Sequence, residues 1–307
     1  MVRESEYRPY IVSADTEGLL KRWAESNGYQ LPDSPFFMGM LKDLERTLST
    51  CVGTEVVIVP EKKLRSGLIS LCKFCELPIV SLDRAYLNDE TNQNIVGFLD
   101  INRAVDEKLR DIGLVCRPNS PDIKTQINLL ENLLNKTGTK RIALVDDVIF
   151  SGKGIINIIN LLKERGILVE KVIAGIMIGN GLEKLKHEGI STLWLELCPE
   201  VVDEVCERDF LAGVPLSGRI ILDGDGKLYS APYFYPFGNP VEWASIPEKS
   251  AEDFSQFCVE QSTLLWGKIE KINNSTIPLK AIPRKLKIQG ITEEVSIVKA
   301  LEKLKKS

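Results

Sequence analysis

Apolar positions follow two different periods along this chain, and each period predicts a different kind of element. In residues 16–27 and 37–49 the apolar side chains recur at helical spacing, and the proline-containing segment 30–35 separates the two predicted helices. Nearly continuous apolar runs of strand length follow at residues 54–60, 77–86, 141–145, 168–179 and 191–198. Because helical segments lie between these runs, we predict an α/β fold with a mainly parallel sheet and helices on both of its faces.

The same pattern predicts three consecutive parts. Residues 1–50 form a helical N-terminal cap, which either covers a ligand site or packs as a layer on the sheet. Residues 51–219 form the α/β domain. Residues 220–307 form a mixed α+β C-terminal extension with a β-hairpin that turns at 224–226, an aromatic loop and a final amphipathic helix. The aromatic side chains of that loop stack on a ligand, bury a dimer contact or close the core.

The stretch 140–154 joins an apolar strand, an acidic pair and a small-residue turn. The strand ends in Asp146 and Asp147, and the turn 151–154 opens into a helical run that Gly166 closes. Open α/β sheets bind ligands at the carboxyl ends of their strands. A glycine-rich turn at a helix N-terminus offers backbone N–H groups to a phosphate, and two carboxylates ahead of it can hold ribose hydroxyls directly or through Mg²⁺. The stretch therefore indicates a site for a phosphorylated sugar.

Residues 145–154, VDDVIFSGKG, resemble the phosphoribosyl-diphosphate (PRPP) signature of type I phosphoribosyltransferases. The resemblance implies the fold of that family, PRPP bound with Mg²⁺, a nucleobase-like acceptor and pyrophosphate as the leaving group. It assigns the ribose contact, the metal contact and the catalytic role to Asp146 and Asp147. It assigns the 5′-phosphate contact to Ser151, Gly152, Lys153 and Gly154.

Three features depart from the family's pattern. Phe150 stands where many purine-specific members carry an aspartate that is the candidate general base, and Phe150 cannot transfer a proton. Gly154 stands where the family often has threonine, so the phosphate site lacks one hydroxyl. The closing loop of the family usually contributes Lys or Arg, whereas residues 87–94 of this chain are acidic and rich in amides.

The resemblance also implies contacts with the diphosphate and with the base. A basic loop before the helix predicted at 68–76 would bind pyrophosphate, because cations at a helix N-terminus suit a leaving group whose negative charge grows. The alternative is a solvated charged loop. The candidate pyrophosphate contacts are Lys62, Lys63, Arg65, Ser66, Gly67 and, at the end of the next strand, Arg84. The candidate base contacts are Phe150, Asp209 and Phe210, and a turn with a buried phenylalanine is the alternative for the last two.

Composition narrows the class of protein. Hydrophobic residues make up 44% of the chain and charged residues 27%, which is ordinary for a globular protein. The net charge of −4 gives no general basic field for nucleic acid or an anionic membrane. Since no apolar run is long enough to span a membrane and the N-terminus has no signal-peptide core, we expect a cytoplasmic protein without a membrane partner. Seven scattered cysteines and one histidine indicate free thiols and no zinc site.

Two functions fit these observations. The first is a phosphoribosyltransferase, by resemblance a homodimer, that transfers phosphoribosyl to or from a nitrogenous base. The alternative is a non-catalytic regulator that senses PRPP or a nucleotide with the same fold. The acidic segment 87–94 and Phe150 are compatible with the alternative.

Overall fold

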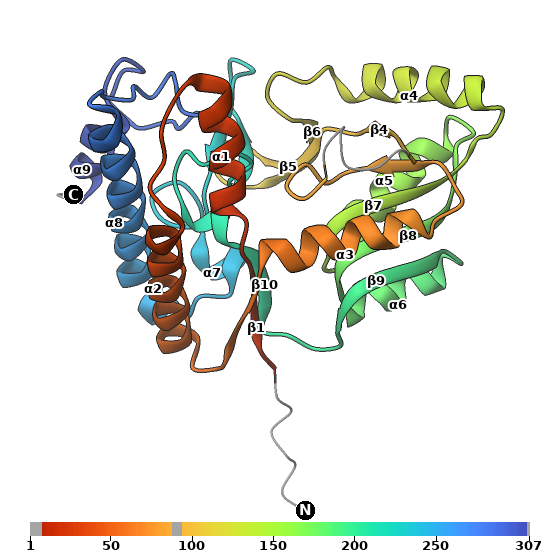
Figure 1. Cartoon of the computed structure of the whole chain (residues 1–307), viewed down its shortest axis with the longest axis horizontal. Helices are drawn as coiled ribbons and strands as arrows, with labels where there is room; N and C mark the ends of the chain where they lie inside the picture. Colours follow the sequence, from red (N-terminus) through yellow and green to blue (C-terminus); the bar gives the residue numbers. More distant parts are fainter. Residues whose placement is uncertain (1–7, 88–93, 306–307) are drawn as a thin grey trace, which may run out of the picture. The chain divides into compact units, whose positions relative to one another are not determined.

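Two parallel sheets lie in separate units of the chain (Figure 1). The structure is a computed structural model that describes residues 8–87 and 94–305. Contacts divide the chain into unit 1, which is Met1–Val59, Ala104–Ile112 and Val202–Ser307, and unit 2, which is Pro60–Arg103 and Gly113–Val201. The domain boundaries after residues 50 and 219 stay a prediction, and the contacts group both ends of the chain in unit 1.

Unit 2 is built on a five-stranded sheet in which neighbouring strands run parallel. The order is β4 (Ile95–Phe98), β3 (Ile79–Ser81), β7 (Arg141–Ile149), β8 (Leu168–Ile178) and β9 (Ser191–Cys198). Since β7 and β8 lie inside the sheet, both are buried over most of their length, which explains their nearly continuous apolar sequence. The predicted mainly parallel α/β fold is confirmed.

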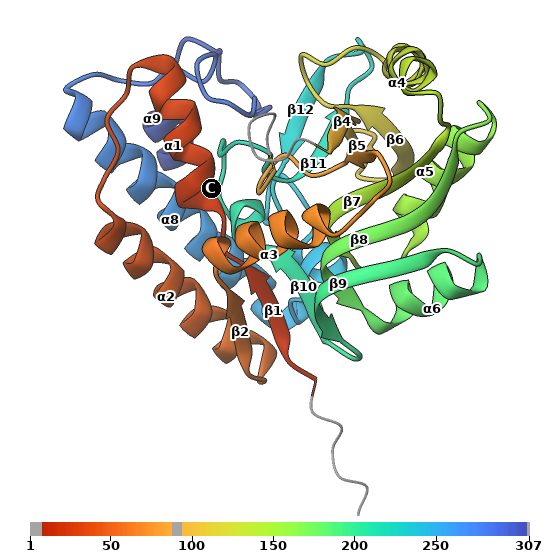
Figure 2. The same ribbon diagram turned by 45° about the vertical axis from the view of Figure 1, so that its right-hand side comes forward.

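Helices cover both faces of this sheet. They are α3 (Glu61–Lys73), α4 (Ile123–Thr137), α5 (Lys153–Lys163) and α6 (Gly179–His187). The apolar sides of α4, α5 and α6 share one core with Leu144 and Ala174. Leu64 of α3 approaches Gly175, the next residue of β8. Because consecutive strand residues face opposite sides, α3 lies on the other face, and the predicted double covering is confirmed (Figure 2).

Unit 1 contains a parallel sheet of three strands. Its order is β10 (Asp203–Cys206), β1 (Tyr10–Ser13) and β2 (Val56–Val59). The sequence predicts one mainly parallel sheet that contains the runs 54–60 and 77–86. The two runs instead join different sheets, because β2 pairs with β1 in unit 1 whereas β3 pairs with β4 and β7 in unit 2. The helices of this unit are α1 (Thr16–Asn27), α2 (Ser34–Val52), α7 (Pro240–Ala244), α8 (Glu248–Asn273) and α9 (Ile297–Leu304).

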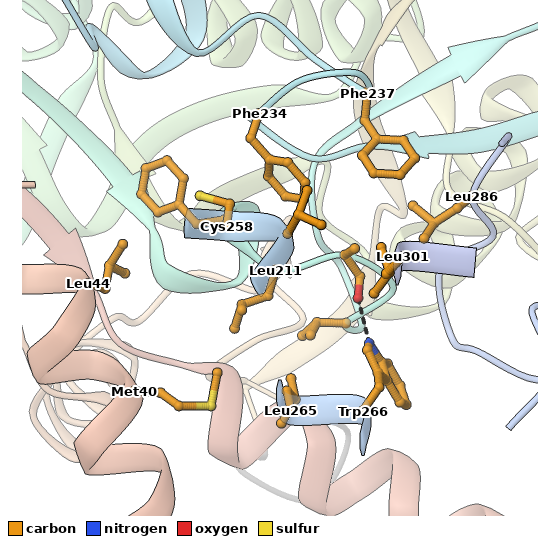
Figure 3. Packing of buried hydrophobic residues seen from close by; sticks show 14 of the residues in the cluster. Met40, Leu44, Leu211, Phe234, Phe237, Cys258, Leu265, Trp266, Leu286 and Leu301 are labelled. Atoms are coloured by element: carbon orange, nitrogen blue, oxygen red, sulfur yellow. Dashed lines mark hydrogen bonds between the residues drawn. The ribbon is translucent and has the colours of Figure 1, made fainter. Parts of the chain in front are cut away.

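One apolar cluster joins the N-terminal and C-terminal helices of unit 1. Figure 3 shows Met40 of α2 in this cluster together with Cys258 and Trp266 of α8 and Leu301 of α9. The Trp266 Nε1–H donates to the Ala212 carbonyl oxygen over 2.7 Å, so the polar group of the buried indole is satisfied. The N-terminal and C-terminal helices of unit 1 therefore pack around the same core.

The C-terminal extension begins with the predicted hairpin. The antiparallel pairing of β11 (Arg219–Leu222) with β12 (Leu228–Ala231) confirms it. β11 also pairs with β5 (Ile101–Val105), and β6 (Asp111–Cys116) follows β5 in the same sheet. In the aromatic loop, Phe234 and Phe237 are buried in the apolar cluster. Of the three alternatives for this loop, these two side chains therefore follow the one in which the loop closes the core. Within residues 8–87 and 94–305, no helix has both the length and the apolar character needed to cross a membrane.

Replacing Trp266 with Phe is expected to destabilise unit 1. The change removes apolar volume from a fully buried site and leaves the Ala212 carbonyl without its donor, at a cost of about 2–4 kcal/mol in the free energy of unfolding. Urea denaturation followed by circular dichroism measures this cost. Leu264→Ala on the same helix is the matched control, because Leu264 is 50% exposed and its loss should cost little. Equal effects of the two changes would contradict the burial of Trp266 in this core.

Candidate functional site

The acidic pair and the small-residue turn meet at the carboxyl end of β7. Asp146 and Asp147 lie within β7, which continues to Ile149, and α5 begins at Lys153. Gly152 occupies the N-cap position of α5 with a φ of 70°, a left-handed conformation that glycine adopts without strain. Because glycine has no side chain to cap the helix, the first turn of α5 keeps backbone N–H groups available to an anion.

The predicted phosphate residues surround this helix N-terminus. The Lys153 N–H donates to the Ser151 hydroxyl oxygen over 3.4 Å, and the Lys153 side chain is exposed. A Cβ atom built on Gly152 would lie 3.4 Å from the Gly181 carbonyl oxygen. No atom lies within 4 Å of a Cβ built on Gly154. Gly152 is therefore in contact with α6, whereas Gly154, where the family often carries threonine, faces open space.

A third carboxylate, missed in the sequence, joins the pair. Asp83 follows β3, and the Leu82 N–H donates to the Val145 carbonyl oxygen over 2.8 Å, which aligns the end of β3 with the acidic residues of β7. The signal for Asp83 in the sequence is a second apolar run that ends in an aspartate. Three carboxyl groups therefore gather at the ends of two neighbouring strands. The buried Asp83 carboxylate accepts hydrogen bonds from three successive backbone N–H groups, those of Ala85, Tyr86 and Leu87.

Burial and mutual repulsion favour the protonated form of these three groups. The pKa of Asp83 is raised to about 7 by burial and then by the charge of Asp147. The pKa of Asp146 is raised to about 7 by burial and the charge of Asp83, and the pKa of Asp147 is raised to about 8 by burial and the charge of Asp146. The interaction between the two side chains of the pair lowers the pKa of Asp146 and raises that of Asp147.

One cation partly offsets the negative charge of the cluster. The guanidinium of Arg117 lowers the pKa of both Asp146 and Asp147, although burial and repulsion outweigh it. Arg117 follows β6 and was not among the residues predicted for the site. Its signal in the sequence was weak, because no local motif surrounds it. The cluster therefore favours ligands that bring positive charge or hydrogen-bond donors, such as a metal ion or sugar hydroxyls.

The acidic pair has the donor type that Mg²⁺ prefers. Backbone N–H groups fix both carboxylates, since Asp147 N–H donates to Asp146 Oδ1 over 3.1 Å and Val148 N–H donates to Asp147 Oδ1 over 2.9 Å. In the described part of the chain, no three His, Cys, Asp or Glu side chains are arranged to hold a metal ion by themselves. The residues fit an ion that keeps water and ligand oxygens in its coordination shell, as Mg²⁺ does.

The basic segment predicted as a pyrophosphate loop is helical instead. Its residues form the first two turns of α3, which begins directly after Pro60, and proline is common at a helix start. Lys62 is exposed, and the Nζ of Lys63 pairs with Glu196 Oε1 over 2.5 Å. The Ser66 hydroxyl donates to the Lys63 carbonyl oxygen within the helix. A Cβ atom at Gly67 would clash with the Leu195 side chain, so this glycine allows α3 to approach β9.

The remaining cations of the predicted pyrophosphate site differ in their surroundings. Arg84 forms two hydrogen bonds of 2.9 Å with the Asp100 carboxylate, and its guanidinium carbon lies 3.8 Å from the centre of the Phe98 ring. This paired and stacked geometry holds Arg84 in place. Arg65 lies in α3 and is half-buried. The pyrophosphate contacts of Arg65 and Arg84 stay predictions.

The predicted base contacts lie in both units. Phe150 is half-buried after β7 in unit 2. Asp209 and Phe210 form part of a short 3₁₀ helix in unit 1, Glu207–Phe210. Phe210 is 1% exposed and packs edge-to-face on Phe254, with ring centres 5.1 Å apart. This burial agrees with the alternative prediction of a turn with a buried phenylalanine. The Asp209 carboxylate accepts the Gly218 N–H over 2.7 Å. Most of the acidic segment 87–94 lies outside the described residues.

Comparison with known proteins gives matches among solved structures only. Neither a protein-family model nor a curated protein matches this chain. The chain is similar to orotate phosphoribosyltransferase from Aeropyrum pernix, with 13% identity, a TM-score of 0.23, and coverage of 44% of this chain and 69% of that one. It is also similar to adenine phosphoribosyltransferase from Thermoanaerobacter pseudethanolicus, with 12% identity, a TM-score of 0.30, and coverage of 45% and 79%. A third similar structure is APRTase from Giardia lamblia in complex with 9-deazaadenine, with 14% identity, a TM-score of 0.30 and the same coverage. These matches span less than half of the chain.

The acidic cluster is expected to make the protein less stable as the pH rises. Because the folded state holds these carboxyl protons more tightly than the unfolded chain, the free energy of unfolding falls from about pH 4 until the folded pKa values near 7 to 8 are passed. In the Asp146→Asn/Asp147→Asn double variant, the loss between pH 5 and pH 8 should shrink by at least about 1 kcal/mol. Urea denaturation at both pH values measures it.

The control for this experiment is Asp225→Asn, which removes an exposed carboxylate from a turn of unit 1. Its pH dependence should match that of the wild type. A double variant that loses as much stability as the wild type between pH 5 and pH 8 would show that the cluster is not protonated in the folded state.

The two glycines of the turn are expected to respond differently to alanine. Gly152→Ala forces a side chain into the left-handed region and should cost about 1–2 kcal/mol in the free energy of unfolding. Gly154→Ala places a methyl group in open space inside the first turn of α5 and should cost nothing or slightly stabilise. Thermal denaturation of the two variants tests the difference. Equal costs would mean that Gly152 is not in the left-handed conformation.

Proposed function

We propose that unit 2 binds PRPP as its magnesium complex at the end of β7 and that the protein transfers phosphoribosyl to or from a nitrogenous base. The observation that carries this proposal is the adjacency of the acidic pair Asp146 and Asp147 to the uncapped N-terminus of α5. A 5′-phosphate suits the backbone N–H groups and dipole of that N-terminus. Ribose hydroxyls suit the two carboxylates as acceptors, and the carboxylates and the turn lie at the same end of β7.

In the proposed reaction, the bond between C1 of the ribose and the diphosphate oxygen breaks, and its electron pair leaves with the diphosphate. The lone pair of a nitrogen of the base forms the new bond to C1, and a proton leaves that nitrogen. Mg²⁺, when bound with the substrate, neutralises charge on the diphosphate. Asp146 and Asp147 would orient the ribose and stabilise the positive charge that develops on its ring, so their contribution is positioning and electrostatic. Phe150 supplies no proton transfer, and the proton goes to water or to the leaving group.

A second candidate is a regulator that binds the same ligand without turnover. Two observations favour it. Lys63 and Arg84, which would stabilise a leaving diphosphate, are paired with Glu196 and Asp100. Phe150 stands where purine-specific phosphoribosyltransferases carry their candidate base. Binding and transfer are therefore tested separately. A cytoplasmic location and a homodimer stay predictions.

Calorimetric titration of PRPP with Mg²⁺ is the test of the proposed site. The wild type should bind, and Asp146→Asn/Asp147→Asn should weaken binding by about a hundredfold or more, since charge-assisted hydrogen bonds to the ribose are lost. Asp225→Asn is again the control, and it should bind as the wild type does. A folded wild type that does not bind PRPP would overturn the proposal. Pyrophosphate release with a panel of nucleobases then separates the enzyme from the regulator.

A further inference from the structure

One guanidinium of unit 2 is fixed beside the acidic cluster by backbone groups. The Arg117 Nε–H donates to the Ile101 carbonyl oxygen over 3.3 Å, and an Nη2–H donates to the Leu82 carbonyl oxygen over 3.0 Å. The Arg117 backbone N–H also donates to the Asp100 carbonyl oxygen over 2.8 Å. Three backbone carbonyls thus hold the residue and set the direction of its side chain.

The remaining nitrogen of this guanidinium is unused. Nη1 of Arg117 is shielded from solvent and has no hydrogen-bond partner within residues 8–87 and 94–305. A buried N–H group of a charged side chain without an acceptor is costly, and structures normally satisfy such groups. The guanidinium lies close enough to Asp146 and Asp147 to affect both carboxyl groups electrostatically. An anionic oxygen placed beside the acidic pair would supply the missing acceptor.

Arg117 also lies on the side of the acidic pair away from the phosphate turn. In the sheet, β7 lies between β3 and β8. The turn 151–154 leads into α5, which packs along β8, whereas Arg117 bonds Leu82 at the end of β3. A ribose whose 5′-phosphate sits at the turn and whose hydroxyls meet the pair therefore directs its C1 substituent toward β3.

We propose that Nη1 of Arg117 binds the C1 diphosphate of PRPP, and this inference rests on the proposed function of the same site. Arg117 takes the role that the sequence assigned to Lys63 and Arg84, which are paired with carboxylates. In a site shielded from water, a guanidinium–phosphate hydrogen bond is strong and directional. Arg117 would thus discriminate between ribose phosphates with and without the diphosphate.

Calorimetric titration of two ligands, PRPP and ribose 5-phosphate, both with Mg²⁺, tests this role. Arg117→Gln should weaken PRPP binding by about tenfold to a hundredfold. Its affinity for ribose 5-phosphate, which lacks the diphosphate, should stay within about twofold of the wild type. If Arg117 has only a structural role, Arg117→Gln should weaken the binding of both ligands equally. Arg165→Gln is the matched control, because Arg165 is an arginine of unit 2 that bonds Asn128 at an exposed position.

Arg117→Lys covers the case in which Arg117→Gln does not fold. Lysine keeps the positive charge beside the carboxylates but cannot satisfy the backbone carbonyls and an anion together. It should weaken PRPP binding severalfold and leave ribose 5-phosphate unaffected. The role of Arg117 is refuted if a variant binds PRPP as tightly as the wild type, or if its affinities for PRPP and ribose 5-phosphate fall by the same factor. In either case the proposed function stands. If the folded wild type does not bind PRPP, both proposals fail.

Discussion

The parallel pairing of β3 with β7 is the constraint on which the site of unit 2 depends. Its register, Ser81 opposite Val145, brings the next residues of both strands to the same edge of the sheet. Asp83 therefore lies beside Asp146 and Asp147, and the strands cannot separate the three carboxyl groups without losing their ladder. Burial and then repulsion raise the pKa of each group, and Arg117 offsets only part of the shift of Asp146 and Asp147. Like-charged groups held this closely are characteristic of binding and catalytic sites.

The constraint also explains what the rest of unit 2 contributes. α5 begins shortly after β7, so its N-terminus is close to the carboxylates, and the positive end of its dipole faces the same edge of the sheet. α3 covers the opposite face from α5, and Gly67 lets it approach β9. The helices therefore hold the strands in place, and the ends of the strands determine where the carboxyl groups lie.

The parts of this site that the sequence predicted are local. The strand, the acidic pair and the turn 145–154 follow one another without interruption, so their pattern alone indicates their arrangement. Asp83 was missed because its proximity to Asp147 comes from the pairing of two strands, β3 and β7, that are far apart in the sequence. Arg117 was missed because its side chain reaches the end of β3 through a hydrogen bond to Leu82, which lies far from it in the sequence.

Two predictions from the sequence were wrong, and both concern packing between distant segments. The start of α3 was predicted as a basic loop before a helix at 68–76, whereas α3 begins at Glu61 and Gly67 within it packs against Leu195. The sequence also did not indicate that β2 pairs with β1 and not with a strand of unit 2, since sequence order does not identify the sheet that a strand joins. Local order along the chain therefore indicates which groups can form a site, and the pairing of distant strands decides which of them meet.

In the proposed function, the distribution of positive charge affects binding of the ribose 5-phosphate part and release of the diphosphate differently. Ground-state binding of a phosphorylated ribose needs the acidic pair and the N-terminus of α5, and both are present on adjacent elements. Release of a diphosphate additionally needs cations at the opposite end of the ribose, because negative charge grows there in the transition state. Carboxylates already hold Lys63 and Arg84 in this structure. In the proposed function, the ribose 5-phosphate part of PRPP binds through the acidic pair and the N-terminus of α5, and the binding and release of the diphosphate would depend on other cations, such as Arg117 beside the carboxylates. Under this proposal, binding of the ribose 5-phosphate part and release of the diphosphate therefore depend on different residues.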